Sequence, residues 1–102
     1  MSEETKAKIE AILNKDKVVL FMKGTPVFPQ CGFSERAVSI LKKLDVEFAA
    51  VDVFEDPNIR EGIKAYGNWP TIPQLYVNNE LIGGSDILME MYQSGELKEV
   101  LS

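Results

Sequence analysis

The chain has 102 residues, 45% hydrophobic and 26% charged, with a formal net charge of -5. These values fit one folded domain, residues 1–102, and exclude a disordered chain. Neither a long basic run nor an apolar stretch of roughly 20 residues is present, so we expect no nucleic-acid partner and no membrane span.

The first half of the chain predicts a helix, a strand, a loop and a second helix. Apolar residues at helical spacing predict a helix over residues 3–15. The short apolar run at residues 18–22 is typical of a buried strand, and residues 24–30, rich in turn formers, predict a loop. An apolar stripe at helical spacing follows from Cys31 onward.

The middle of the chain predicts a second strand and a third helix. The strand is expected over residues 47–53. Asp56 followed by Pro57 is a typical helix start, and Gly67 is expected to end that helix.

The last third predicts a hairpin and a C-terminal helix. Strands are expected at residues 74–77 and 81–82, and Ser85 is the expected N-cap of the helix that follows. A first β-α-β unit should be parallel, and the hairpin should add antiparallel strands. The sequence therefore predicts an α/β fold, a mixed sheet with helices on both faces.

Cys31 is the single cysteine, and the chain has no histidine. These counts exclude histidine-ligated metals and any disulfide within the chain. Because Cys31 stands at a loop-to-helix junction, free N–H groups and the helix dipole should favour its thiolate. The alternative is a buried structural cysteine, which its Pro/Gly-rich surroundings argue against. Ser34 stands where a second, resolving cysteine would be, or it serves only to satisfy a backbone N–H group in the first helical turn.

Two short segments could present backbone groups to a ligand. If the Ile72-Pro73 bond is cis, the N–H and C=O of Ile72 turn outward toward an extended peptide, and otherwise the segment is a simple loop. A glycine pair leads into Ser85 and Asp86. The N–H groups of that helix start would suit a carboxylate and Asp86 an ammonium group, unless both residues only cap the helix.

Three cations are further candidates. Lys23 ends the first strand, and Arg60 and Lys64 lie one turn apart on the third helix. Each alone can be explained as a solvated surface charge. Lys23 is the best candidate because strand ends in α/β sheets commonly face ligand crevices.

Four ordered segments together resemble the monothiol glutaredoxin family, the class with Cys-Gly-Phe-Ser (CGFS). The matching segments are residues 21–26, 29–34, 69–77 and 83–87. The resemblance runs over nearly the whole chain. It implies a thioredoxin fold, with a four-stranded mixed sheet of order 2-1-3-4, and a cis bond before Pro73.

The resemblance also implies a groove for glutathione. By analogy, Lys23 and Arg60 hold the glycyl carboxylate, and Ile72 pairs with the backbone of the tripeptide. Ser85 and Asp86 hold the γ-glutamyl end, through a backbone N–H group and a side chain respectively. Many relatives carry a second cysteine where this chain has Ser85, so that possible disulfide partner is missing.

The function implied by the resemblance is iron–sulfur chemistry. A [2Fe–2S] cluster usually needs four thiolates, and one chain supplies only Cys31. The family bridges the cluster between two subunits with the help of two glutathione molecules, so Cys31 is the expected metal ligand of a homodimer. The apo form is then a monomer, and recipient apoproteins take up the cluster.

Two other functions remain open. Cys31 could serve a thiol–disulfide oxidoreductase that removes glutathione from protein mixed disulfides. The chain could also be a sensing module that recruits a BolA-like protein, a partner known in the family. The acidic N-terminus resembles neither a signal peptide nor a transit peptide, so a cytoplasmic protein is expected, or an organellar matrix protein whose transit peptide has been removed.

Overall fold

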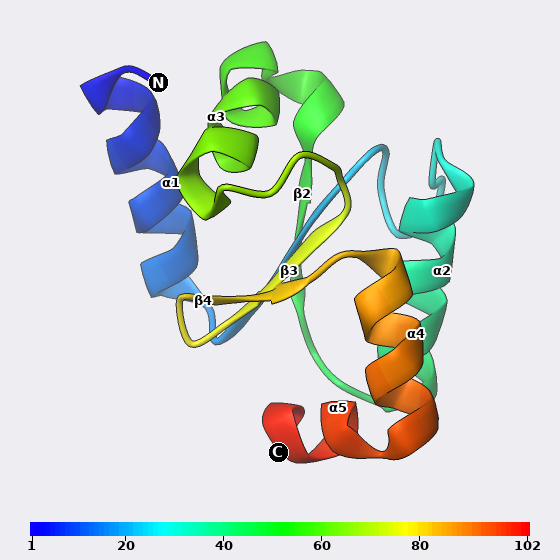
Figure 1. Ribbon diagram of the computed structural model, residues 1–102. Helices are drawn as coiled ribbons and strands as arrows, with labels where there is room; N and C mark the ends of the chain where they lie inside the picture. Colours follow the sequence, from blue (N-terminus) through cyan, green and yellow to red (C-terminus); the bar gives the residue numbers. More distant parts are fainter.

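A computed structural model describes residues 1–102 and shows a four-stranded sheet flanked by helices (Figure 1). In chain order the elements are α1 (Glu3–Lys15), β1 (Val18–Met22), α2 (Gly32–Lys43), β2 (Ala49–Asp52), the 3-10 helix η1 (Val53–Glu55), α3 (Pro57–Gly67), β3 (Gln74–Val77), β4 (Glu80–Gly83), α4 (Ser85–Ser94) and α5 (Glu96–Leu101). The strand order is β2-β1-β3-β4, as predicted. None of the helices has the length and apolar character needed to cross a membrane.

The register of the sheet brings the ends of several strands to one edge. β1 and β2 are parallel, with Met22 opposite Asp52, so the segments that follow both strands begin side by side. β3 is antiparallel to β1 and starts at that same edge, with Gln74 opposite Phe21. β4 is antiparallel to β3 and ends there, so four chain segments meet at this edge.

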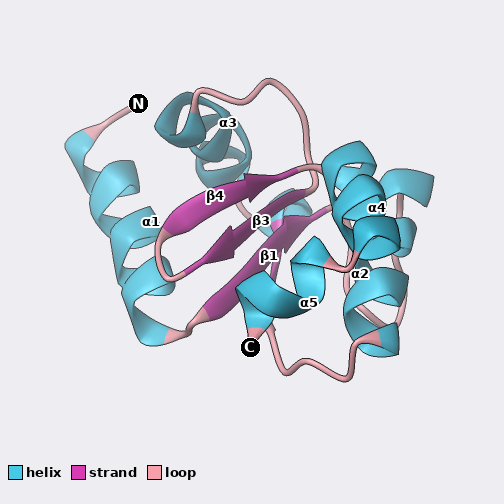
Figure 2. Ribbon diagram, turned by 60° about the horizontal axis from the view of Figure 1, so that its bottom comes forward, coloured by secondary structure: helices cyan, strands magenta, loops and turns pink.

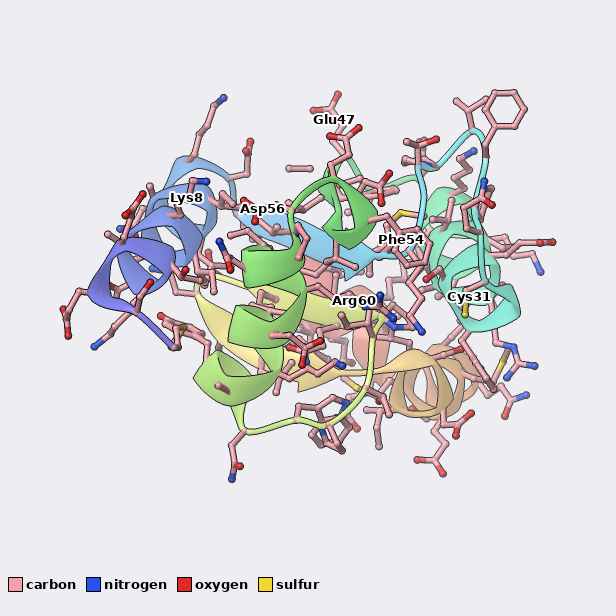
Figure 3. All side chains as sticks on the ribbon, turned by 90° about the horizontal axis from the view of Figure 1, so that it is seen from above. Lys8, Cys31, Glu47, Phe54, Asp56 and Arg60 are labelled. Atoms are coloured by element: carbon pink, nitrogen blue, oxygen red, sulfur yellow. The ribbon has the colours of Figure 1, made fainter.

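Helices cover both faces of the sheet (Figure 2). α1 and α3 lie together on one face, and an ion pair between Lys8 and Asp56, with an N···O distance of 3.0 Å, joins α1 to the start of α3 (Figure 3). The Asp56 carboxylate also accepts from the N–H groups of Asn58 and Ile59. Asp56 therefore caps α3, as the sequence predicts.

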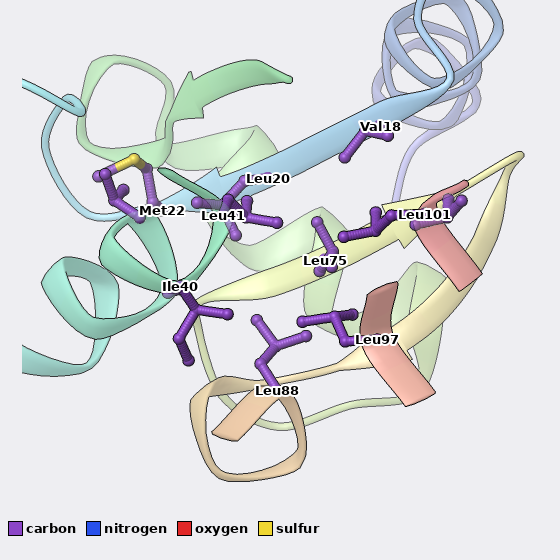
Figure 4. Packing of buried hydrophobic residues seen from close by; sticks show 12 residues of the cluster. Val18, Leu20, Met22, Ile40, Leu41, Leu75, Leu88, Leu97 and Leu101 are labelled. Carbon is purple, nitrogen blue, oxygen red and sulfur yellow. The ribbon is translucent and has the colours of Figure 1, made fainter. Parts of the chain in front are cut away.

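Two hydrophobic cores form because β1 is buried on both faces. Val18, Leu20 and Met22 point into the core between the sheet and α2, α4 and α5 (Figure 4). Val19 and Phe21 point into the core beneath α1 and α3. Residues alternate between the two cores because successive side chains of a strand face opposite sides.

The second strand is shorter than predicted at both ends, because it begins at Ala49 rather than at residue 47 and ends at Asp52 rather than at residue 53. The Asp52 carboxylate accepts from the Phe54 N–H at 2.9 Å, and this bond turns the chain into η1. Val53 is fully buried in the first turn of η1 and not in the strand.

Ser85 is not the N-cap of α4, and the prediction was wrong by one residue. Gly84 occupies the N-cap position and Ser85 is the first residue of the helix. The turn tolerates no side chain there without adjustment, because a Cβ on Gly84 would lie 3.2 Å from the Pro73 carbonyl oxygen. As predicted, α3 does end at Gly67, and Asn68 takes the left-handed conformation that follows, with φ 51°.

Candidate functional site

Cys31 lies at the junction where a closed loop meets α2. It is the N-cap residue of the helix, with extended φ and ψ of -153° and 135°. Its side chain is free and half-buried, so the sulfur is within reach of solvent. Its carbonyl oxygen accepts from the Glu35 N–H at 2.9 Å, which starts the first helical turn.

The loop before Cys31 is a tight hairpin. The Gln30 N–H donates to the Lys23 carbonyl at 2.9 Å, and the Thr25 N–H donates to the Phe28 carbonyl at 3.2 Å. Gly24 has φ 88°, and a Cβ there would lie 2.5 Å from the Phe28 carbonyl oxygen. Only glycine allows this close approach, so the loop returns directly to the helix start.

The pKa of the Cys31 thiol lies below its ordinary value. Burial opposes ionisation and raises the pKa, but several groups outweigh it: the backbone N–H groups of Ser34 and Phe33, the charge of Lys23 and the Ser34 hydroxyl. The sulfur makes no capping hydrogen bond of normal geometry. The lowering therefore comes from hydrogen-bond donors in the first turn of α2 together with the charge of Lys23.

Ser34 links the end of β1 to the start of α2. Its side chain is fully buried, and its hydroxyl oxygen accepts from the Lys23 N–H at 3.0 Å. The interpretation that Ser34 satisfies a backbone N–H group is confirmed, although the donor belongs to the residue after β1 rather than to the helix. This bond holds Lys23 beside Cys31.

The three candidate cations lie in different surroundings. Lys23 is half-buried and close enough to Cys31 to lower its pKa. The Arg60 guanidinium lies over the Phe54 ring, 5.2 Å from its centroid, and its Nε is buried with no hydrogen-bond partner (Figure 3). Lys64 pairs with Glu61 at 3.4 Å on the surface of α3. Lys23 and Arg60 thus form no ion pair within the chain, while Lys64 belongs to a surface ion pair.

A cleft of about 180 Å³ joins the remaining candidates. Its lining consists of Phe33, Trp69, Thr71, Ile72, Pro73, Gly84, Ser85, Asp86 and Ile87. The cleft brings Ile72, Ser85 and Asp86 together, and Phe33 connects it to the helix start beside Cys31. Cys31, Lys23 and Arg60 do not line it.

Three structural features distinguish the residues that line the cleft. The Ile72-Pro73 bond is cis, as the resemblance implies. Ser85 is buried and its hydroxyl has no hydrogen-bond partner. The exposed Asp86 carboxylate lies 3.7 Å from the Arg36 guanidinium, a contact that the sequence did not predict.

Gln74 organises the loop that forms one wall of the cleft. Its side chain is fully buried, and its Nε2 donates to the carbonyls of Trp69 and Thr71, both at 3.1 Å. The Tyr76 hydroxyl donates to Gln74 Oε1 at 3.1 Å, and burial raises the pKa of Tyr76 to about 12. The sequence signal that we missed is a glutamine inside an otherwise apolar strand, since a buried amide needs partners.

The largest surface hollow lies elsewhere. It has a volume of about 870 Å³ and runs from residues 16–18 past Lys42 to Leu101. It contains none of the candidate residues, so its size alone does not make it the site.

Fold and site together define a thioredoxin-type protein with one thiol at the N-terminus of a helix. The glutaredoxin family model matches residues 18–82. An uncharacterized monothiol glutaredoxin, ycf64-like, of Synechocystis is 56% identical over 101 residues, which cover 99% of this chain and 94% of the relative. The chain therefore belongs to the glutaredoxin family, and among its members it is similar to the monothiol proteins.

Solved structures agree with this assignment. The solution structure of reduced poplar apo GrxS14 superimposes with a TM-score of 0.82, at 51% identity over 92% of this chain and 86% of that one. A buckwheat glutaredoxin–glutathione complex, at 21% identity, has a TM-score of 0.85 and covers 99% of this chain and 94% of that one. This second likeness shows the fold alone.

Proposed function

We propose that the chain is a glutathione-dependent carrier of a [2Fe–2S] cluster, which two copies of the chain hold between them and pass to recipient proteins. The observation that carries this proposal is the solitary Cys31 thiol, half-exposed and with a lowered pKa. A thiolate is the form that binds iron.

Counting ligands supports the shared arrangement. No group of three or more His, Cys, Asp or Glu residues in the chain could hold a metal ion. Four thiolates are usual for the cluster. Two chains supply two, so two must come from an external thiol, and glutathione is the thiol that we propose. Half of the ligands are then exchangeable, which suits a protein that gives its cluster away.

The glutathione site would extend along both sides of Cys31. Lys23 and Arg60 are the proposed partners of the glycyl carboxylate, because the charge of Lys23 acts on the thiol and the Nε of Arg60 has no hydrogen-bond partner within the chain. Ile72 would pair with the tripeptide backbone. At the other end the Ser85 N–H, in the first turn of α4, would meet the γ-glutamyl carboxylate and Asp86 its ammonium group. A related fold, the buckwheat glutaredoxin, was solved as a glutathione complex.

The surface around Cys31 suits a protein partner. Val27 and Phe28 at the hairpin tip are 75% and 71% exposed, and Phe33 next to the thiol is 56% exposed. Val27 and Phe28 belong to the loop before Cys31 and Phe33 to the first turn of α2, and exposed apolar side chains can mark an interaction surface. A second copy of the chain would cover them in the cluster-bound dimer, and a BolA-like protein would use the same face.

Anaerobic reconstitution with iron, sulfide and glutathione tests the proposal. We expect visible absorption typical of a [2Fe–2S] cluster, lost when glutathione is left out. Cys31→Ser should remain colourless, whereas Ser39→Ala, on the exposed side of α2, should behave like the wild type. A colourless wild-type chain, or colour that does not depend on glutathione, would contradict the proposal.

The accessible, low-pKa thiol also favours a second candidate, removal of glutathione from protein mixed disulfides. Cys31 would attack the glutathione sulfur and release the protein thiolate. A second glutathione would then attack the Cys31–glutathione disulfide, giving glutathione disulfide and the free Cys31 thiolate. Fast turnover of a small glutathione mixed disulfide by a chain that fails to assemble a cluster would favour this reading.

A further inference from the structure

Asp52 joins two segments that the proposed glutathione site needs at a fixed separation. It is the last residue of β2, opposite Met22 of β1. One oxygen, Oδ1, accepts two backbone hydrogen bonds, from the Gly24 N–H at 3.0 Å and from the Phe54 N–H at 2.9 Å. Neither Gly24 nor Phe54 belongs to β2, the strand of Asp52. The carboxylate therefore connects the loop after β1 to η1.

Each of these donors leads to one of the two cations. Gly24 directly follows Lys23, whose charge acts on Cys31. Phe54 carries the ring over which the Arg60 guanidinium lies, 5.2 Å from the centroid. Figure 3 shows Phe54 and Arg60 close together on the side of α3 that faces Cys31. A single carboxylate oxygen thus fixes the backbone beside Lys23 and the aromatic support of Arg60.

We propose that Asp52 is a positioning residue that sets the separation of Lys23 and Arg60, and through it the preference of the site for a free glycyl carboxylate. This inference rests on the proposed function, in which the two cations bind the C-terminal end of glutathione. Asp52 itself does not touch the ligand.

The physical need for such a residue is clear. Two cations aimed at one carboxylate repel each other until the ligand arrives, so their backbones must be held. Bonds to a carboxylate are stronger than bonds to a neutral acceptor. The Gly24 N–H is buried, and without Asp52 it would lack a partner, which would release the start of the loop.

The test uses a thiol–disulfide exchange reaction. In it, the Cys31 thiol and glutathione disulfide give the Cys31–glutathione disulfide and one glutathione. Intact-mass spectrometry measures its equilibrium constant for glutathione disulfide and for the same disulfide with both glycyl carboxylates amidated. The ratio of the two constants reports the carboxylate contact and is insensitive to a general change in thiol chemistry. For the wild type we expect a preference of about 10-fold for the free carboxylate, as charge-assisted bonds give.

Asp52→Ala should reduce this preference to roughly 2-fold, while Asp52→Asn, which keeps an acceptor oxygen, should restore most of it. Phe54→Leu, at an exposed position, should lower the preference without disturbing Asp52. Glu55→Ala is the matched control, since it removes an exposed carboxylate from the same turn and should change nothing.

The possible negative results distinguish a wrong positioning role for Asp52 from a wrong glutathione site. If Asp52→Ala or Phe54→Leu keeps the wild-type preference, the positioning role is wrong even though the cations bind the carboxylate. An equal fall of both constants in Asp52→Ala would also overturn it, because that result describes a merely structural residue. If the wild type itself shows no preference, Lys23 and Arg60 do not bind the carboxylate, and the proposed glutathione site fails first.

Discussion

The Cys31 thiol gains its character from groups on two elements. Burial alone would raise its pKa, yet N–H groups of α2 and the charge of Lys23 at the end of β1 lower it. Ser34 has two roles. Its N–H group and its hydroxyl lower the pKa of the thiol, and its hydroxyl oxygen also accepts a hydrogen bond from the Lys23 N–H. The reactivity of the sulfur therefore depends on the junction between β1 and α2 and not on the cysteine alone.

Lys23→Met should raise the pKa of Cys31, because it removes the one cation that acts on the thiol. The thiolate fraction at neutral pH then falls, and alkylation by iodoacetamide slows. In both proteins the rate should decline as the pH falls through the pKa of the thiol, and the decline should occur at higher pH in the variant. The pH dependence of the alkylation rate measures this.

Lys43→Met is the control, because Lys43 is exposed in the last turn of α2, at the opposite end from Cys31. It should leave the pH profile where the wild type has it. Identical profiles for Lys23→Met and Lys43→Met would remove Lys23 from the surroundings of the thiol.

At the scale of single elements, the segment before β3 depends on side chains rather than on backbone pairing. Residues 68–73 belong to no helix or strand. Gln74 holds the segment through its bonds to two of its carbonyls, and Tyr76 orients the Gln74 amide. The wall of the cleft that contains Ile72 is thus supported from inside the fold.

Gln74→Leu should lower the free energy of unfolding by about 2–3 kcal/mol, because two carbonyls and the Tyr76 hydroxyl lose their partner. Tyr76→Phe removes one bond only and should cost about 1 kcal/mol. Urea unfolding compares them. Equal costs for the two variants would show that the bonds from Gln74 to the loop contribute nothing.

The elements themselves could largely be predicted from the sequence, because periodicity and turn residues encode them. The strand at 18–22 and the helix that starts after Asp56 fall where they were expected. Errors occurred where a single hydrogen bond or a close backbone contact decides the local path. Asp52 shortens β2 by accepting from the Phe54 N–H, and crowding near Pro73 leaves the N-cap of α4 to Gly84.

The candidate site was harder to predict, since much of it arises from contacts between separate elements. Position along the chain was enough to nominate Cys31 and Lys23. The hydrogen bonds of Asp52 and Gln74 and the stacking of Arg60 on Phe54 could not be found in this way. Hydrophobic periodicity says which face is buried, but it does not say which polar groups meet.

For the whole molecule, the sheet is the feature that assembles the site. The segments that follow β1, β2 and β4 and the segment that precedes β3 all lie at the same edge of the sheet. Candidate residues belong to these segments. A hydrophobic core on each face of the sheet holds these segments in place relative to one another. The resulting site has a single thiol, so the proposed cluster requires a second molecule of the chain.

Native mass spectrometry of the anaerobically reconstituted protein tests this requirement most directly. We expect a cluster-bound species whose mass equals two chains, one [2Fe–2S] cluster and two glutathione molecules, since two Cys31 thiolates leave two of the four usual ligands to be supplied. The Cys31→Ser chain should appear only as an apo monomer. A cluster bound to one chain, or a cluster-bound dimer without glutathione, would contradict a cluster shared through two Cys31 thiolates and two glutathione molecules.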